Sequence, residues 1–279
     1  MANYSAADVK RLREQTGAGM MDCKNALVGA NGDFEAAVEA LRVKGAKDVS
    51  KRAGRTAANG LVTAALDGTS VGVLLELNCE TDFVAKTDLF QQVAADVASA
   101  AMTSKVSDRL ALLSVEARPG TMVQQIIEEA GAALKEKLEL GRLARLEGGF
   151  VTAYLHRSDP SLPPARGALV QLASADPETG KDIAQQIAAS QPAYLNRADV
   201  PAEVVAKERR IAEQMTRDEG KPEQAVPKIV EGRVNAFFKD VVLLEQPFIK
   251  DPKKTVQQVL SERGVVVRAF ARFQIGQAG

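Results

Sequence analysis

Hydrophobic residues in the N-terminal part of the chain recur at helical spacing in three short runs. Ser5 can cap the first run, and Asp8 lies where the positive end of a helix favours an acid. The runs begin at Ser5, Met20 and Asp33 and end at Gly17, Gly29 and Gly45. They predict a compact three-helix bundle with a very small core. The basic segment 47–59 that follows is expected to be a linker or a solvated helix.

A second pattern occurs twice further along the chain: two apolar strands, a helical run and a third strand. The first strands, 60–66 and 149–155, are near copies of each other. The corresponding later elements are 71–77, 90–101 and 140–146 in the first copy, and 167–172, 182–190 and 265–275 in the second. This repetition predicts an α+β fold with two related subdomains, each a small antiparallel sheet with helices on one face.

An insertion separates the second copy's helix from its last strand. It comprises a helical run over 201–219, a turn at 220–222 and a second run that leads to Phe238. Pro222 suits the first turn of the second helix, and Pro227 must lie in a first turn or kink the helix. The pattern predicts an antiparallel helical hairpin. Its charged residues fit a solvated face. Alternatively, the hairpin projects from the body of the protein and docks another molecule.

Composition excludes several classes of function. The 279 residues carry 36 basic and 36 acidic side chains, few aromatics and no Trp, so the strongly basic or base-stacking surface typical of nucleic-acid binding is missing. No apolar stretch is long enough to span a membrane, and the polar N-terminus predicts a cytoplasmic protein. Cys23 and Cys79 lack paired spacing and are expected to be reduced, small hydrophobic residues.

Signals for enzymatic chemistry are weak. Gly17-Ala18-Gly19 lacks the strand and the Lys-Ser/Thr ending of a phosphate loop. His156 is the single histidine, which excludes a multi-histidine metal cage, and taken alone it is expected to be structural or merely exposed. Glu80 and Asp82 are close for a carboxylate pair that would flank a scissile bond. We therefore expect no catalytic residues, no metal site and no cofactor.

The segment Thr81-Asp82-Phe83-Val84 lies between the apolar strand 71–77 and a helix that begins near Asp88. An acid and a large aromatic at the end of a strand form a tip that another molecule could contact. Alternatively, Asp82 caps the helix and Phe83 packs in the core. The corresponding turn of the second copy, 173–179, keeps nothing similar, which favours a role special to the first subdomain.

Met20 and Met21 adjoin a glycine-rich corner of the predicted bundle. Adjacent residues point about 100° apart on a helix, so both cannot be buried in so small a core and one is expected to be exposed. An exposed methionine is an adaptable contact surface. The alternative, that both fill a thin core, stays open.

Two long motifs resemble the bacterial elongation factor Ts family. The first is 12–24, from Leu12-Arg13-Glu14-Gln15 to Cys23-Lys24, and the second is 78–86, Asn78-Cys79-Glu80-Thr81-Asp82-Phe83-Val84-Ala85-Lys86. Gly32-Asp33, Leu41-Arg42, Glu231-Gly232-Arg233 and Gln246-Pro247-Phe248 add to the resemblance. It runs from Ala2 to about Gly276 in the right order and without large gaps.

The resemblance implies a guanine nucleotide exchange factor that promotes GDP release from the GTPase elongation factor Tu in protein synthesis. It further implies a UBA-like helical domain at 1–54, core subdomains at 55–140 and at 141–198 with 235–279, and a coiled-coil hairpin at 199–234. In the family an Asp-Phe pair enters the GTPase near its nucleotide-bound magnesium, and here that pair is Asp82 and Phe83.

Carried over in the same way, Arg13, Met20 and Met21 belong to the face that meets the GTPase, and His156 lies near the partner surface. Some members carry a C-terminal helical module, and its contacts are expected to be absent or replaced here. A homodimer or a 2:2 complex with the partner is left open. A scaffold or RNA-associated adaptor is the rival function, against which the neutral net charge argues.

Overall fold

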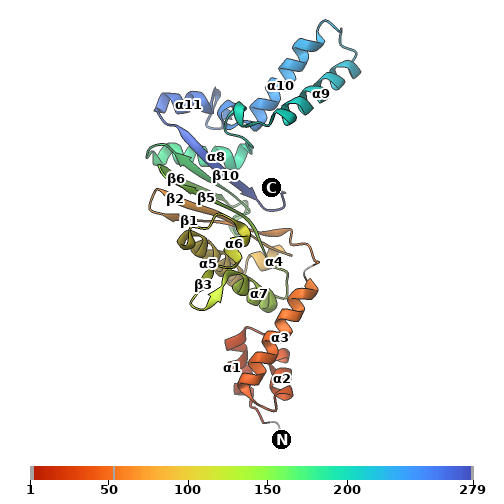
Figure 1. Cartoon of the computed structure of the whole chain (residues 1–279), viewed down its shortest axis with the longest axis vertical. Helices are drawn as coiled ribbons and strands as arrows, with labels where there is room; N and C mark the ends of the chain where they lie inside the picture. Colours follow the sequence, from red (N-terminus) through yellow and green to blue (C-terminus); the bar gives the residue numbers. More distant parts are fainter. Residues whose placement is uncertain (1–2, 53, 278–279) are drawn as a thin grey trace.

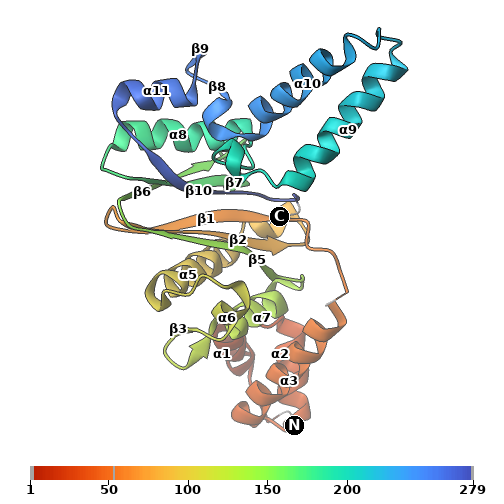
Figure 2. The same cartoon turned by 45° about the horizontal axis from the view of Figure 1, so that its top comes forward.

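Helical and sheet layers follow one another along the long axis of the molecule (Figures 1 and 2). The computed structural model describes residues 3–52 and 54–277. A helical bundle lies at one end, two antiparallel sheets with their covering helices lie in the middle, and a helical hairpin extends from the other end. The predicted α+β class is confirmed. None of the described helices has both the length and the apolar character needed to cross a membrane.

The N-terminal bundle consists of α1 (Ala6–Thr16), α2 (Met20–Gly29) and α3 (Phe34–Arg52). Ser5 caps α1 as predicted: its Oγ accepts the Asp8 N–H at 3.2 Å, and the Asp8 carboxylate accepts the Ser5 N–H at 2.8 Å. The small core of the bundle is formed by Leu12, Cys23, Leu27, Ala37 and Leu41.

The predicted end of the third helix at Gly45 is wrong, because α3 continues to Arg52. Gly45 lies where α3 passes α7 (Val123–Leu134), and a β-carbon at this position would sit 3.5 Å from that of Ala132. That spacing is an ordinary van der Waals contact, so this glycine is tolerated inside the helix and does not end it. Arg52, buried at the end of α3, donates from Nη1 to the Gly131 carbonyl of α7 at 3.1 Å.

The first sheet has the antiparallel order β1-β2-β5, formed by Asn59–Asp67, Val71–Cys79 and Glu139–Glu147. One of its faces packs on α5 (Asp88–Ser104), α6 (Arg109–Leu113) and α7. A short hairpin of β3 (Glu116–Arg118) and β4 (Thr121–Met122) connects α6 to α7. The branched aliphatic side chains of β2 are nearly all buried, as expected of the central strand.

The second sheet repeats this plan with the antiparallel order β10-β7-β6, formed by Val267–Gln274, Arg166–Leu172 and Phe150–His156. Its outer face packs on α8 (Pro177–Ser190) and α11 (Val256–Arg263). Short elements complete it: η1 (Arg197–Asp199), η2 (Leu243–Glu245), β8 (Pro247–Phe248) and β9 (Asp251–Thr255). Both predicted three-stranded units are thus present.

The two sheets pack face to face, which the sequence pattern did not predict (Figure 2). A shared core joins Val62 and Leu74 of the first sheet to Val151, Leu169 and Phe273 of the second. Gly72 allows this approach, because a β-carbon there would lie only 2.7 Å from side-chain atoms of Leu169 and Val151. The molecule therefore has four central layers, with helices outside and two sheets inside.

The predicted helical hairpin is formed by α9 (Ala202–Asp218) and α10 (Val226–Val241). Pro227 lies in the first turn of α10, where its missing N–H costs nothing. Pro222 lies in the connecting turn and not in a helix's first turn, which corrects that expectation. Ala212 and Thr216 of α9 face Val226, Val230 and Val234 of α10, so the hairpin has its own narrow apolar seam.

Candidate functional site

The segment 81–84 forms a helical tip at the end of β2. Thr81 has extended backbone angles and caps the short helix α4 (Asp82–Ala85), with its Oγ1 accepting the Val84 N–H at 3.3 Å. The cap is therefore Thr81 and not Asp82, which is the first residue of the helix. This single turn fixes which of its side chains face the core and which face solvent.

Phe83 points away from the protein. Its side chain is 76% exposed, whereas Val84 and Ala85 on the opposite side of the same turn are buried. The alternative in which Phe83 packs in the core is wrong, and Phe90 of α5 is the buried aromatic of this region. A large aromatic held in solvent on a defined turn is available for contact with another molecule.

The tip is braced by the loop between α7 and β5. Glu136 Oε2 accepts the backbone N–H groups of Glu80 and Thr81, each at 3.0 Å, and Glu136 Oε1 accepts the Thr81 hydroxyl at 2.6 Å. The carbonyl of Glu80 accepts the Asn59 amide at 2.8 Å. The backbone that carries Asp82 is thus tied to two other elements.

Glu80 has a structural role here. Its Oε1 accepts the Lys137 N–H at 2.6 Å and lies 3.3 Å from Nη1 of Arg55. Its carboxylate is therefore committed to the loop that carries Glu136, which argues against a catalytic pair of Glu80 with Asp82.

Lys86 is the charged neighbour of the two exposed tip residues. Its Nζ lies 3.1 Å from Oδ2 of Asp82 and 5.6 Å from the centroid of the Phe83 ring. Both members of the ion pair are substantially exposed, so the pair contributes little stability, and another molecule could compete for Asp82 at little cost.

Two further predicted site residues, Met20 and Met21, lie on the N-terminal bundle. Their side chains are 57% and 62% exposed, so both are exposed where only one was expected to be. Arg13 is also exposed, one turn before the α1–α2 corner that carries the two methionines. All three residues lie on the N-terminal bundle, away from the tip at 81–84.

His156 ends strand β6 and is half-buried, with its Nδ1 3.1 Å from the Tyr154 hydroxyl. The loop that follows folds toward the first sheet, where the Val62 N–H donates to the Pro164 carbonyl at 2.8 Å. Within this loop the pKa of Asp159 is lowered, chiefly by hydrogen bonds from Ser161 and also by the charge of Lys86. The His156 end of the second sheet therefore lies near the tip.

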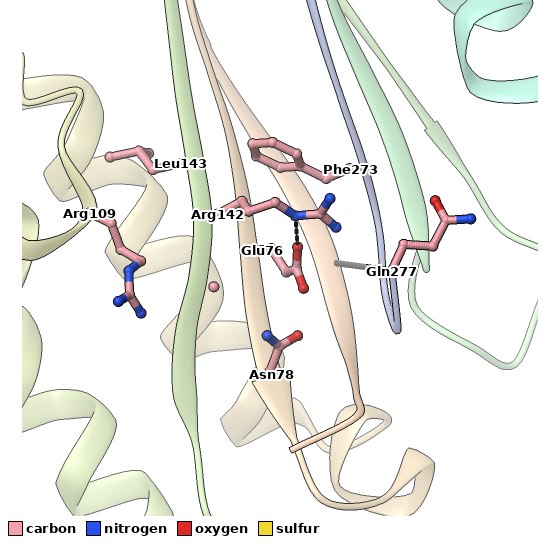
Figure 3. A pocket seen from close by; sticks show the side chains of 8 residues that line it. Glu76, Asn78, Arg109, Arg142, Leu143, Phe273 and Gln277 are labelled. Carbon is pink, nitrogen blue, oxygen red and sulfur yellow. Dashed lines mark hydrogen bonds and ion pairs between the residues drawn. The ribbon is translucent and has the colours of Figure 1, made fainter. Parts of the chain in front are cut away.

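A shallow cavity of about 450 Å³ lies between β2, β5 and the end of β10 (Figure 3). Glu76, which is almost fully buried, is paired with Arg142 at 2.6 Å. Arg142 also donates to the Gln274 carbonyl at 2.7 Å and lies 4.9 Å from the centroid of the Phe273 ring. These contacts join the two sheets, so the polar groups of the cavity serve structure.

Over residues 3–52 and 54–277, no cluster of three or more His, Cys, Asp or Glu side chains could hold a metal ion. Cys23 and Cys79 are free and buried, as expected. Burial raises the pKa of the Cys79 thiol to about 12, with a further contribution from the nearby Glu136 carboxylate. Cys79 is therefore a protonated core residue and not a reactive thiolate.

Sequence reasoning located the tip but missed Glu136. Glu136 and Thr81 are 55 positions apart in the sequence, and no periodic signal links them. Only the meeting of β2 with the loop before β5 brings the two together.

The known proteins that this chain resembles belong to one family. The family model for elongation factor Ts matches residues 80–277. Elongation factor Ts of Thermobifida fusca is 61% identical over 278 residues, covering 100% of both chains, and that of Acidothermus cellulolyticus is 61% identical over 277 residues, covering 99% of this chain and 100% of the relative. Elongation factor Ts of Streptomyces coelicolor is 57% identical over 277 residues, with the same coverage.

Proposed function

The chain belongs to the elongation factor Ts family, and from this premise we propose that its exposed tip, Thr81-Asp82-Phe83-Val84, opens the nucleotide site of the GTPase elongation factor Tu. Family membership makes the chain the nucleotide exchange factor for elongation factor Tu, a cytoplasmic translation factor and not an enzyme. The observation that carries the proposal for the tip is the 76% exposure of Phe83 on a turn held by Glu136.

Exchange requires no covalent chemistry. A factor that binds the nucleotide-free GTPase more tightly than the loaded one must lower nucleotide affinity by the same ratio, because the two binding equilibria are linked. Burial of one phenylalanine contributes about 1.5–3 kcal/mol, which corresponds to about one or two decades in affinity. Phe83 therefore supplies part of the effect, and other contacts must add to it.

Asp82 is proposed to act on the partner's magnesium. Magnesium requires near-octahedral geometry and retains bound waters, so a carboxylate brought close to it can disturb its ligands or its hydration. The Asp82 side chain is 51% exposed, and within residues 3–52 and 54–277 its ion-pair partner is the exposed Lys86, which leaves it available for this role.

The remaining contacts are proposed to come from two other surfaces. Arg13, Met20 and Met21 would form the bundle's contact with the GTPase, and His156 would lie at the partner surface of the second subdomain. The exposure of both methionines and the position of His156 near the tip support this arrangement. We also propose that the factor acts as a homodimer or in a 2:2 complex, which light scattering of the complex would test.

We also propose a division into domains. It comprises a UBA-like bundle at 1–54, core subdomains at 55–140 and at 141–198 with 235–279, and a coiled-coil hairpin at 199–234. Strand β5 pairs with β2, so the first subdomain is better ended at Glu147 than at 140, and helix α10 extends the hairpin to Val241.

The test is release of a labelled GDP from elongation factor Tu, followed by stopped flow with increasing amounts of this protein. Wild-type protein should raise the release rate to a plateau, and Phe83→Ala should lower that plateau while the protein stays folded. Wild-type rates for the variant would reject the proposed role of Phe83.

A further inference from the structure

Two arginines share the outer face of the second sheet at the end that lies near the tip. Arg166 on β7 is paired in register with Gln274 of β10 and with His156 of β6, and Arg272 is two residues before Gln274 on the same strand. Arg166 and Arg272 therefore point to the same side of adjacent strands. Both are half-buried.

Neither arginine has an acidic partner within the described parts of the chain, 3–52 and 54–277. Other half-buried arginines of this protein have acidic partners, as Arg142 has Glu76 and Arg263 has Asp182. Arg272 instead meets the neutral side-chain amides of Gln274 and Gln277 through its two Nη atoms.

The Nε of Arg272 is buried and has no hydrogen-bond acceptor among the residues that the structure describes. The pKa of Arg272 is lowered, first by burial and then by the charges of Arg166 and Arg142. Two like charges thus lie on one face of adjacent strands in half-buried positions, and no acidic side chain of the described residues pairs with either.

We propose that Arg166 and Arg272 form a binding site for a carboxylate side chain of the partner GTPase. This inference rests on the function proposed above, because it identifies the partner as elongation factor Tu. A planar guanidinium presents donors in a fork that matches a carboxylate, and an approaching acid would replace the neutral Gln277 amide on Nη1 of Arg272.

The position of the pair is continuous with the proposed interface. Arg166 lies directly beside His156, and the loop between them is joined to β1 of the first sheet through Pro164 and Val62. Beyond Gln274, a β-carbon at Gly276 would lie 3.7 Å from the Ala58 carbonyl, next to the start of β1. Tip and arginine pair can therefore contact one partner at the same time.

A protein carboxylate fits this site better than a nucleic-acid phosphate. Binding to a phosphate backbone depends on many cations, and the chain carries equal numbers of acidic and basic side chains. Two arginines supply enough donors to bind one carboxylate. At a protein interface, such charged groups set the orientation of the two partners and the rate at which they associate.

The experiment compares Arg166→Gln, Arg272→Gln and the double variant with the wild type in stimulated GDP release from elongation factor Tu. The factor concentration that gives half-maximal release should rise about tenfold for each single variant, because a charge-assisted bond is lost. The plateau rate should stay unchanged, since the tip is intact. Arg268→Gln, an exposed arginine on the same strand, is the matched control and should behave as wild type.

Thermal unfolding separates binding from a structural role. Removing an uncompensated charge should leave the melting temperature unchanged or raise it, while binding weakens. A variant that unfolds earlier and loses binding in proportion would overturn the proposal, as would an unchanged half-maximal concentration. Loss of RNA binding with normal GDP release would assign the pair to nucleic acid instead.

The two proposals fail in different ways. If the wild type does not accelerate GDP release at all, the proposed function fails, and this site loses its partner with it. If the wild type is active and the double variant has the same half-maximal concentration, only the carboxylate site is rejected.

Discussion

Glu136 binds Thr81 at two points, accepting its backbone N–H at 3.0 Å and its hydroxyl at 2.6 Å. Thr81 in turn caps the helical turn that exposes Phe83. A single carboxylate thereby fixes the start of the turn, and the exposed side chains are held before any partner arrives. Such preorganisation reduces the entropy lost on binding.

Glu136→Ala should lower the plateau of GDP release several-fold and reduce the free energy of unfolding by about 1–3 kcal/mol, because two backbone N–H groups lose their acceptor. Glu136→Gln should restore part of both, since its amide oxygen can accept the two backbone N–H groups but its NH2 cannot accept the Thr81 hydroxyl. Stopped-flow release and urea unfolding measure the two effects.

The control for this substitution is Glu129→Ala, which removes an exposed acid from the same helix region without touching the tip. It should match the wild type in both measurements. Loss of stability in Glu136→Ala with undiminished release would show that exchange does not need the brace.

The fold was predictable where burial imposes a simple period. The aliphatic run 71–77 predicted the central strand β2 (Val71–Cys79), because such a strand is buried on both faces. Gly45 misled the prediction of α3, since a single glycine inside a helix is tolerated and α3 continues to Arg52. The packing of one sheet on the other leaves no recognisable pattern in the sequence. The close approach at Gly72 becomes apparent only once the two sheets are seen together.

The candidate site, like the fold, was predictable from the sequence only in part. Asp82 and Phe83 stood out because the second copy of the unit lacks them, which is a comparison within one sequence. Glu136 could not be found, since a glutamate between two lysines is the composition of any solvated loop. The lack of an acidic partner for Arg272 among the described residues likewise depends on which side chains surround it in space.

Phe83→Ala should slow stimulated GDP release by about 10- to 100-fold at limiting factor concentration. This is the change in affinity that corresponds to the burial of one phenylalanine side chain. The free energy of unfolding should change by less than about 0.5 kcal/mol, because the side chain is exposed. Leu110→Ala, another exposed apolar residue, should leave release unchanged. An equal loss in both variants would point to non-specific apolar contact.

Asp82→Asn should slow GDP release in the presence of magnesium and leave stability nearly unchanged, because its ion pair with Lys86 is exposed. With magnesium removed by a chelator, the variant and the wild type should converge, since the proposed target of the carboxylate is gone. Lys86→Gln should not slow release. A deficit of the same size with and without magnesium would refute an action on the metal.

The Cys79 thiol should resist modification at pH 8, because it is buried and its pKa is raised from 9.0 to about 12. Labelling should be more than about a hundredfold slower in the native protein than in urea. The raised pKa also makes a contribution to stability that is fully present below pH 9 and lost as the pH rises toward 12. Compared with Cys79→Ala, the wild type should therefore lose stability over this alkaline range.

Arg52 connects the N-terminal bundle to the body, through its hydrogen bond to the Gly131 carbonyl in α7. If the bundle face and the tip bind one GTPase together, a fixed spacing between them raises the effective concentration of the second contact. Arg52→Ala should then raise the half-maximal factor concentration several-fold while leaving the plateau rate intact.

The decisive comparison combines Arg52→Ala with Met20→Ser and Met21→Ser. Once the bundle face no longer contacts the partner, its orientation becomes irrelevant, so adding Arg52→Ala to the methionine variant should cost nothing further. Fully additive losses would mean that Arg52 acts on exchange independently of the bundle. Non-additive losses would establish that the bundle and the tip work as one rigid binding surface, with α3 setting the distance between them.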